Sequence, residues 1–489
     1  MADPIVQYLK ANGPTLSSSI VARLIAQGVS RESARKRVSR AGGDVRRLVG
    51  LQFPNRERFV FLNDQFGKPE FHENLANALQ QSRTSYGRAL IALESRGGAV
   101  PEHHFAIAAG LPIENAKGQL LANLVLDRLL KVGILTRTPT PDGNVISRWD
   151  SGLIDARRRA TLTVEDVVLS VIRTWMGKIN WTSPTATQVR SRRIVPKFSQ
   201  FRWDLVGPSY LNSIIYFKTQ KVVNGFVVGD IQLYKTISTA DLEPFFAKWG
   251  ALTNQRRTTR FQPIFIAESF DSNALQQLRA KGAVIGRPET LFGPDIAKQL
   301  RELIGTIEHA AAAVTKNPSA VFQLLSELTK IEGAASNLRG VVLELMIARL
   351  FQLEGYNIDI RQQIQSQTGE RAEIDVKAAN KQEVVCVECK GKSPGVLVGD
   401  TEIQEWLDKT VVRIKSWFGL TMTLPQRKRF EFYSSTGYTE QAKILIATIQ
   451  QAHKKQPINF YGGEDVVAKL RTQNERALIN IFQEQFSSK

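Results

Sequence analysis

The stretch Arg371–Lys392, RAEIDVKAANKQEVVCVECKGK, constrains this chain more than any other part of it. Two runs of strand-forming residues flank a short polar tip, which is the pattern of a β-hairpin. Asp375 lies on the first run, and Glu388 and Lys390 lie on the second. Because side chains alternate between the two faces of a strand, Glu388 and Lys390 point the same way while Cys389 points into a core. Burying carboxylates beside an ammonium group is costly, and a divalent metal held by the carboxylates gives the arrangement a purpose.

The segment before this hairpin, Asn337–Tyr356, is predicted to be a helix that carries a further carboxylate. Gly355 ends the helix, and Glu344 lies in its middle, next to the apolar stripe. That stripe recurs at helical spacing, at Val341, Leu345, Ala348 and Phe351.

This order, a helix glutamate followed by EID and then by ECK, resembles the PD-(D/E)xK nuclease superfamily. Within it, the phrasing is similar to the Holliday-junction-resolvase-like and Mrr-type restriction endonuclease branches. The resemblance covers residues 337–470 and implies hydrolysis of phosphodiester bonds that leaves 5′-phosphate ends.

The resemblance also implies an active site made of Glu344, Asp375, Glu388 and Lys390. Asp375, Glu388 and the carbonyl group of Cys389 would hold Mg²⁺, or Mn²⁺ in its place. Glu344 would hold a second metal ion or orient a ligand water. Lys390 would lower the pKa of the attacking water and stabilise charge on the phosphate.

An alternative reading treats the same residues as a solvated strand face, on which Asp375 pairs with its neighbours at little gain in stability. Glu373 shares the face of Asp375, so it is a candidate auxiliary ligand. Lys392 continues the face of Glu388 and Lys390 and is a candidate phosphate contact.

Composition points to a polyanionic partner. The chain has 489 residues, enough for about three or four domains. Its formal net charge is +19, which favours nucleic acid over a membrane surface. Its two cysteines, Cys386 and Cys389, form one isolated Cys-x-x-Cys, so neither a zinc site nor a disulfide is expected. No signal peptide or membrane-spanning run is found, and we expect a cytoplasmic protein without a membrane partner.

Residues 1–70 have the pattern of a winged helix-turn-helix. Helices are expected at Pro4–Asn12, Ser17–Gln27 and Arg31–Arg40, followed by two strands joined around Pro54–Arg56. The residues expected to contact DNA are Arg31, Arg35, Lys36, Arg37 and Arg40 on the third helix, and Arg56 and Arg58 at the hairpin tip. A recognition helix with a wing on the phosphate backbone needs this distribution of charge, although a solvated helix or a protein-binding winged helix would also carry it.

Residues 80–150 are expected to form a second, less basic winged-helix-like domain, suited to packing or dimerisation. Its helices are predicted at residues 85–95, 101–109 and 113–132, and its wing at residues 134–149.

Residues 155–295 repeat the order of elements of the C-terminal segment, which suggests a duplicated, degenerate nuclease domain. By position Asp204 corresponds to Asp375, Asp230 to Glu388 and Gln232 to Lys390, with Glu165 as the helix glutamate. Glutamine cannot supply positive charge to the reaction, so a scaffold or DNA-binding duplicate is favoured over a second active site. An unrelated α/β domain is the alternative. Candidate phosphate contacts, which solvated loops would also explain, are Arg190, Arg192, Arg193, Lys197, Arg256, Arg257 and Arg260.

We therefore predict a multidomain α/β protein: winged-helix domains, a degenerate and then an intact restriction-endonuclease-like α/β/α domain at residues 337–489, joined by a helical connector at residues 296–336. The predicted function is metal-dependent cleavage of double-stranded DNA in restriction or phage defence. The alternatives are a repair or recombination nuclease and a non-catalytic DNA-binding or regulatory protein. Double-strand cutting with one active centre per chain would require a homodimer, and a helicase or other defence-system protein is a further candidate partner.

Overall fold

A computed structural model describes residues 3–114, 118–140, 143–191, 194–218, 221–255, 259–331, 334–420, 427–452 and 457–487. The predicted phosphate contacts at Arg192, Arg193, Arg256 and Arg257 lie outside these residues.

The chain is a mixed α/β protein with two compact units. The first unit comprises Met1–Thr138, Asn144–Asp155 and Thr185–Gly286, and the second comprises Pro139–Gly143, Ala156–Pro184 and Arg287–Lys489. This division is coarser than the five predicted segments, whose boundaries stay a prediction.

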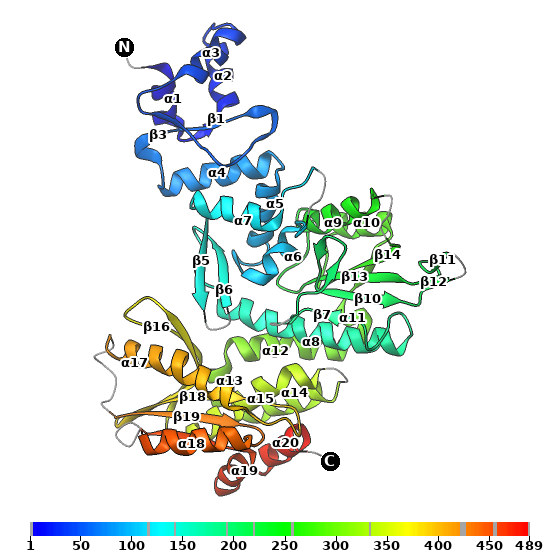
Figure 1. Cartoon of the computed structure of the whole chain (residues 1–489), viewed down its shortest axis with the longest axis vertical. Coiled ribbons are helices and arrows are strands. Elements are labelled where there is room, and N and C mark those ends of the chain that lie inside the picture. Colours follow the sequence, from blue (N-terminus) through cyan, green and yellow to red (C-terminus); the bar gives the residue numbers. More distant parts are fainter. Residues whose placement is uncertain are drawn as a thin grey trace. The chain divides into compact units, whose positions relative to one another are not determined.

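The first unit begins with helices α1 (Pro4–Asn12), α2 (Ser17–Ala26) and α3 (Arg31–Arg40), drawn in blue in Figure 1. They adjoin a small sheet of β1 (Thr15–Leu16), β3 (Phe59–Leu62) and β2 (Val45–Arg47), in that order. The bounds predicted for α1 and α3 are confirmed. Both helices start at a capping side chain: Asp3 accepts a hydrogen bond from the Ile5 N–H at 2.9 Å, and Ser30 accepts one from the Ser33 N–H at 3.3 Å.

Arg47 ties the end of α3 to the sheet. Its guanidinium donates to the carbonyl oxygens of Val38, Ser39 and Ala41 at 2.6, 2.8 and 2.9 Å. These carbonyls would otherwise be unsatisfied at the helix C-terminus, so one side chain both caps α3 and fixes its direction relative to β2.

The next part of the chain contains helices, a hairpin and the strand β4 (Ala99–Pro101). The helices are α4 (Pro69–Gln81), α5 (Ser85–Glu94), α6 (Phe105–Ala109) and α7 (Ala122–Lys131), and the hairpin is β5 (Leu135–Thr140) with β6 (Gly143–Arg148).

The helix predicted over residues 113–132 is wrong in its first half, because α7 begins only at Ala122. Pro112 instead forms a β-bridge with Phe201, and the Ile113 N–H donates to the Gln200 carbonyl at 2.9 Å. Tertiary pairing therefore overrides the helical pattern of this segment.

The larger sheet of the first unit has the strand order β15-β14-β13-β10-β7 in the part of the chain that is described. Its strands are β7 (Gln188–Val189), β10 (Leu205–Ser209), β13 (Gly225–Gln232), β14 (Phe261–Ala267) and β15 (Val284–Gly286). The pairs from β7 to β13 are antiparallel, and those from β13 to β15 are parallel. Helices α9 (Glu243–Thr253) and α10 (Ser272–Lys281) form the crossovers.

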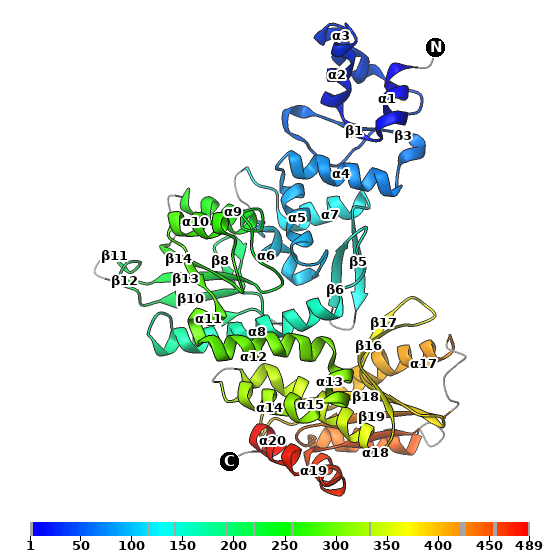
Figure 2. The ribbon, with the colours of Figure 1, turned by 180° about the vertical axis from the view of Figure 1, so that it is seen from behind.

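The sheet of the second unit has the same pattern of pairing. Its strands are β16 (Asn357–Gln365), β17 (Arg371–Ala379), β18 (Glu383–Lys390), β19 (Arg427–Ser434) and β20 (Ile458–Tyr461), in that order. The pairs up to β18 are antiparallel and the later ones are parallel. No strand was predicted over Asn357–Gln365, where β16, labelled in Figure 2, forms the edge of the sheet.

Helices pack around this second sheet. They are α15 (Ala335–Leu353), α16 (Asp400–Glu405), α17 (Val412–Phe418), α18 (Glu440–Ala452), α19 (Gly463–Thr472) and α20 (Arg476–Phe486). Val384 and Cys386 of β18 share a core with Trp406, Ile414 and Ala442. Because both faces of β18 are covered, its first half is fully buried.

The helical connector consists of α12 (Pro294–Glu308), α13 (Ala310–Lys316) and α14 (Pro318–Thr329), and the predicted break at Pro318 is confirmed.

The helix predicted at the start of the middle domain is α8 (Ala156–Lys178), and it belongs to the second unit. There it packs against α12 and α15. Asn337 of α15 donates from Nδ2 to the Asp166 carbonyl at 2.9 Å and to Ser170 Oγ at 2.7 Å. None of the described helices is long and apolar enough to cross a membrane.

Candidate active site

Three neighbouring strands of the second unit place an arginine and two carboxylates side by side. In the register of β16 and β17, Arg361 falls opposite Asp375. Continuing the register of β17 and β18 by one step puts Asp375 beside Glu388. Side chains at such cross-strand positions are near neighbours. The Cys389 N–H donates to Asp375 Oδ2 at 2.7 Å, which fixes the aspartate against β18.

Helix α15 brings the third predicted carboxylate to the same place. Glu344, which is only 9% exposed, forms a two-pronged ion pair with Arg361: Nε lies 2.7 Å from Oε2, and Nη2 lies 3.3 Å from Oε1. Lys390 forms an ion pair with Glu388. The structure therefore brings all four predicted catalytic residues together, with Arg361 among them. Their roles stay a prediction.

A close approach at Gly391 sets the distance between β18 and α15. A Cβ atom at this position would lie 2.5 Å from the Arg339 carbonyl oxygen at the start of α15, which is closer than atoms can approach. Glycine therefore lets the end of β18, with Lys390, come within reach of the helix that carries Glu344.

Burial and the mutual repulsion of the carboxylates dominate the electrostatics of this site. Burial raises the pKa of Asp375 well above its usual range, and the nearby charges of Glu388 and Glu344 raise it further. Burial likewise raises the pKa of the Cys389 thiol, helped by Asp375. Burial lowers the pKa of Lys390, but the charges of Glu388 and Asp375 outweigh it, and the net shift is upward.

The donor chemistry of these residues fits a divalent cation. In the described part of the chain no group of three or more His, Cys, Asp or Glu side chains is already arranged as a metal site. Instead Glu344 holds Arg361, Glu388 holds Lys390 and Asp375 holds a backbone N–H. Carboxylate and carbonyl oxygens are the ligands that Mg²⁺ and Mn²⁺ prefer, and a cation would relieve the repulsion that raises the pKa of Asp375.

The predicted auxiliary residues have partners of their own. Glu373 contacts Gln363 of β16 and lies 3.7 Å from Arg159 Nη1 of α8. Lys392 forms an ion pair with Glu402 of α16, at 2.6 Å from Oε2. Lys392 is therefore tied to the protein, and its predicted contact with phosphate is untested.

Two arginines beside the carboxylates, Arg361 and Arg159, were not predicted from the sequence. Arg361 lies in NIDIRQQIQ, where polar residues interrupt the alternation of a strand, so no pattern reveals β16. Arg159 lies in the run Arg157–Arg159, which is conspicuous, but only the tertiary fold brings it to Glu373.

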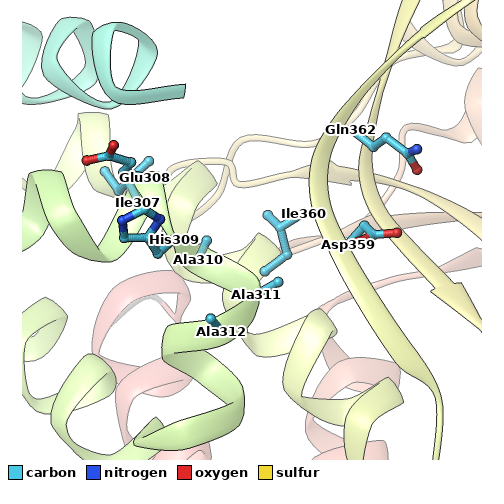
Figure 3. A pocket seen from close by; sticks show the side chains of 9 residues that line it. All are labelled: Ile307, Glu308, His309, Ala310, Ala311, Ala312, Asp359, Ile360 and Gln362. Carbon is cyan, nitrogen blue, oxygen red and sulfur yellow. The ribbon is translucent and has the colours of Figure 1, made fainter. Parts of the chain in front are cut away.

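A cavity of about 370 Å³ lies in the second unit between the α12–α13 junction and β16 (Figure 3). Its lining includes Glu308, His309, Asp359 and Gln362. None of the predicted catalytic residues lines it, so this cavity is distinct from the carboxylate cluster.

The first unit contains a second centre with the same layout. Asp204 is opposite Asp230 by continuation of the β10–β13 register, and it accepts a hydrogen bond from the Ile231 N–H at 2.8 Å, as Asp375 does from Cys389. Arg190 Nη1 lies 2.9 Å from Asp204 Oδ1, and the prediction of Arg190 as a phosphate contact is wrong because its side chain is buried in this ion pair. Gln232, at the position of Lys390, donates to the Ser95 carbonyl at 2.8 Å.

In this second centre, a buried lysine of the protein occupies the second aspartate. Lys248 of α9 reaches Asp230 at 2.6 Å and lies over the Trp203 ring, 3.8 Å from its centroid. Lys248 is fully buried and Asp230 is nearly so. Burial raises the pKa of Asp230 to about 6, and burial lowers the pKa of Lys248. A lysine in the apolar helix EPFFAKWGALT was the signal that could have revealed this pair.

Glu165, predicted as the helix glutamate of the second centre, lies on α8 in the second unit. It is buried in an ion pair with Arg158, at 3.0 Å. It therefore belongs to a different unit from Asp204 and Asp230.

The predicted DNA contacts are exposed basic side chains of the first unit. The residues concerned are Arg31, Arg35, Lys36, Arg37, Arg40, Arg56 and Arg58. Lys36 pairs with Glu32 one turn earlier, at 2.8 Å. Ala34 and Val38 hold the opposite side of α3 in the core, so the charges face solvent.

Comparisons with known proteins leave the family open. No family model and no curated protein matches the chain. A solved structure of a protein of unknown function, AF1548, is 20% identical, with a TM-score of 0.22, and the match covers 27% of this chain and 66% of that one. Restriction endonuclease FokI is 10% identical (TM-score 0.21, 94% of this chain and 83% of that one), and FokI bound to DNA is 10% identical (TM-score 0.23, 94% and 82%). Similarity at this level does not establish a shared fold.

We predict that Asp375→Asn raises the melting temperature of the metal-free protein at pH 8, by about 2–4 °C if the gain is near 1 kcal/mol. Because the pKa of Asp375 is raised in the folded state, ionisation destabilises the fold as the pH rises above about 4, the usual value for aspartate. The gain should therefore shrink toward pH 4. Thermal melts in EDTA measure it, with Asp359→Asn at an exposed carboxylate as control. An equal effect at both pH values would contradict the prediction.

We predict that Lys248→Met destabilises the protein by about 3–5 kcal/mol, because it leaves the Asp230 carboxylate buried without its partner. The double variant Lys248→Met/Asp230→Leu should recover at least half of that loss. Urea denaturation of the full chain measures both, with Lys298→Met on the surface as control. A double variant no more stable than the single one would show that the pair is not coupled.

Proposed function

We propose that this chain is a metal-dependent DNA endonuclease of the restriction-endonuclease-like type, acting in restriction or phage defence, with its active centre in the second unit. The observation that supports this proposal is the convergence of Glu344, Asp375, Glu388 and Lys390 from a helix and two strands. The charges of Glu388 and Glu344 raise the pKa of the buried Asp375, and a divalent cation bound between these carboxylates would relieve that repulsion.

Each residue has a role in this proposal. Asp375, Glu388 and the Cys389 carbonyl would hold Mg²⁺ or Mn²⁺, and Glu344 would act beside them. When bound, the metal supplies Lewis acidity to the phosphate and lowers the pKa of a water. Lys390 is protonated at neutral pH like any lysine, and the charges of Glu388 and Asp375 raise its pKa further, so it suits charge stabilisation rather than proton abstraction.

The first unit would bring the enzyme to double-stranded DNA. Its three N-terminal helices and small sheet have the composition of a winged helix-turn-helix, and α3 presents its arginines to solvent. Phosphate contacts from such a helix provide affinity and register, while base contacts provide specificity. A double-strand cut would require a second copy of the chain, because one centre per chain is proposed to be active.

The second centre is proposed to be a structural duplicate. Lys248 and Arg190 already satisfy Asp230 and Asp204, and Gln232 holds the Ser95 carbonyl instead of presenting a charge. These contacts support a scaffold role for this sheet.

We expect purified wild-type protein to nick or cut plasmid DNA with Mg²⁺ or Mn²⁺ and not in EDTA. Asp375→Ala and Lys390→Ala should each lower the rate by at least about 100-fold, because each removes a group that acts on the reacting phosphate. Asp204→Asn should cleave normally, which separates the two centres. Circular dichroism of each variant checks folding. DNA binding without cleavage under every metal condition would instead favour a regulatory DNA-binding protein.

We expect Arg31→Ala/Arg35→Ala to weaken binding to any duplex and to reduce the slope of log affinity against log salt by about 2, since each lost phosphate contact contributes about 0.9. Fluorescence anisotropy of a labelled duplex at several salt concentrations measures the slope. Lys298→Ala, an exposed lysine on α12, is the control. An unchanged slope would exclude these two arginines from the DNA interface.

A further inference from the structure

Both large sheets place an arginine opposite their first aspartate. In the second unit Arg361 of β16 is opposite Asp375. In the first unit, continuing the β7–β10 register puts Arg190 opposite Asp204, and the Arg190 N–H donates to the Asp204 carbonyl at 2.8 Å. Two centres in one chain can therefore be compared at the same position.

The two arginines hold different carboxylates. Arg190 lies directly on Asp204, whose other oxygen takes the Ile231 N–H, so both oxygens of that aspartate are engaged. Arg361 instead pairs with Glu344. Among the described residues, Asp375 forms no ion pair with an arginine or a lysine. Asp375 is therefore free of an arginine in the sheet where Glu344 holds that arginine, whereas Asp204 is paired with Arg190.

The backbone of Arg361 adds an independent observation. Its φ angle is +55°, in the left-handed region that residues other than glycine seldom adopt. This conformation costs about 1–2 kcal/mol in the middle of a strand. Glycine would adopt it without strain, so the strained arginine indicates a need for a positive charge beside the buried Glu344.

We propose that Glu344 is a positioning residue of the nuclease centre that acts through Arg361: it holds the Arg361 guanidinium away from Asp375, which leaves Asp375 available to a divalent cation. This inference rests on the proposed function of the centre. Glu344 then acts through Arg361 rather than as a direct metal ligand. In the second centre, the corresponding arginine, Arg190, forms an ion pair with Asp204.

The position of the Arg361 guanidinium affects metal binding because a guanidinium and a metal ion compete for the same carboxylate. A two-pronged arginine–carboxylate pair uses the same oxygens that a metal would bind. If Glu344 loses its charge, the remaining carboxylates that act on Arg361 are Glu373 and Asp375, whose charges already favour its protonated form. Arg361 would then turn toward Asp375 and block the metal.

Isothermal titration calorimetry with Mn²⁺ and the full chain, without DNA, tests this proposal. Glu344→Gln should weaken Mn²⁺ binding by at least about 10-fold, the range typical of residues that orient metal ligands. The double variant Glu344→Gln/Arg361→Gln should restore affinity to within about 3-fold of the wild type. Arg361→Gln alone should bind Mn²⁺ at least as tightly as the wild type.

A matched control separates this effect from a change of net charge. Glu344→Gln/Arg159→Gln also removes one positive charge, from the arginine beside Glu373, and should leave binding as weak as Glu344→Gln does. Restored affinity in this control, or no rescue by Arg361→Gln, would overturn the proposal. If Glu344→Gln does not fold, weakened binding in Arg361→Gln alone would overturn it as well.

The outcomes also distinguish this inference from the proposed function. Mn²⁺ binding by the wild type that Asp375→Ala abolishes, without rescue in the double variant, would remove only the role of Arg361. Equal titrations for wild type and Asp375→Ala would remove the metal site itself, and with it both proposals.

Discussion

Mutual repulsion among Glu344, Asp375 and Glu388 is the constraint around which the second unit is organised. Like charges this close and this buried are tolerated only where the surroundings compensate them. The compensation comes from Arg361 on an edge strand, from Lys390 two residues after Glu388 and from a backbone N–H. Helix and sheet must meet closely for these groups to act together, and the glycine after Lys390 permits that contact.

The first unit deals with a similar pair of carboxylates in a different way. Its cations come from α9 and from the segment after β7, and they are as buried as the aspartates that they neutralise. Such a cluster gains no stability over well-packed apolar residues, but breaking one half of it is costly. Gln232, at the position that corresponds to Lys390, binds the Ser95 carbonyl there and so joins the end of α5 to the sheet.

The sequence predicted those features that depend on local pattern. The bounds of α1 and α3 follow from capping side chains and from apolar spacing, and the hairpin of Asp375 and Glu388 follows from strand alternation. Features that depend on residues far apart in the sequence were not predicted. No local pattern indicates β16, and the roles of Lys248 and Arg361 depend on carboxylates of other elements. The start of α7 was misjudged because residues 112–113 pair with a strand far along the chain.

The order of segments has a consequence for how the protein is made. Helix α8 belongs to the second unit, yet it leaves the ribosome before the larger sheet of the first unit and well before α12 and α15, against which it packs. Contacts of such long sequence separation form late. We therefore expect the apolar side chains of α8 to lack their partners on α12 and α15 until those helices have been synthesised. A nascent chain held at this stage is the point at which a chaperone would have the most surface to bind.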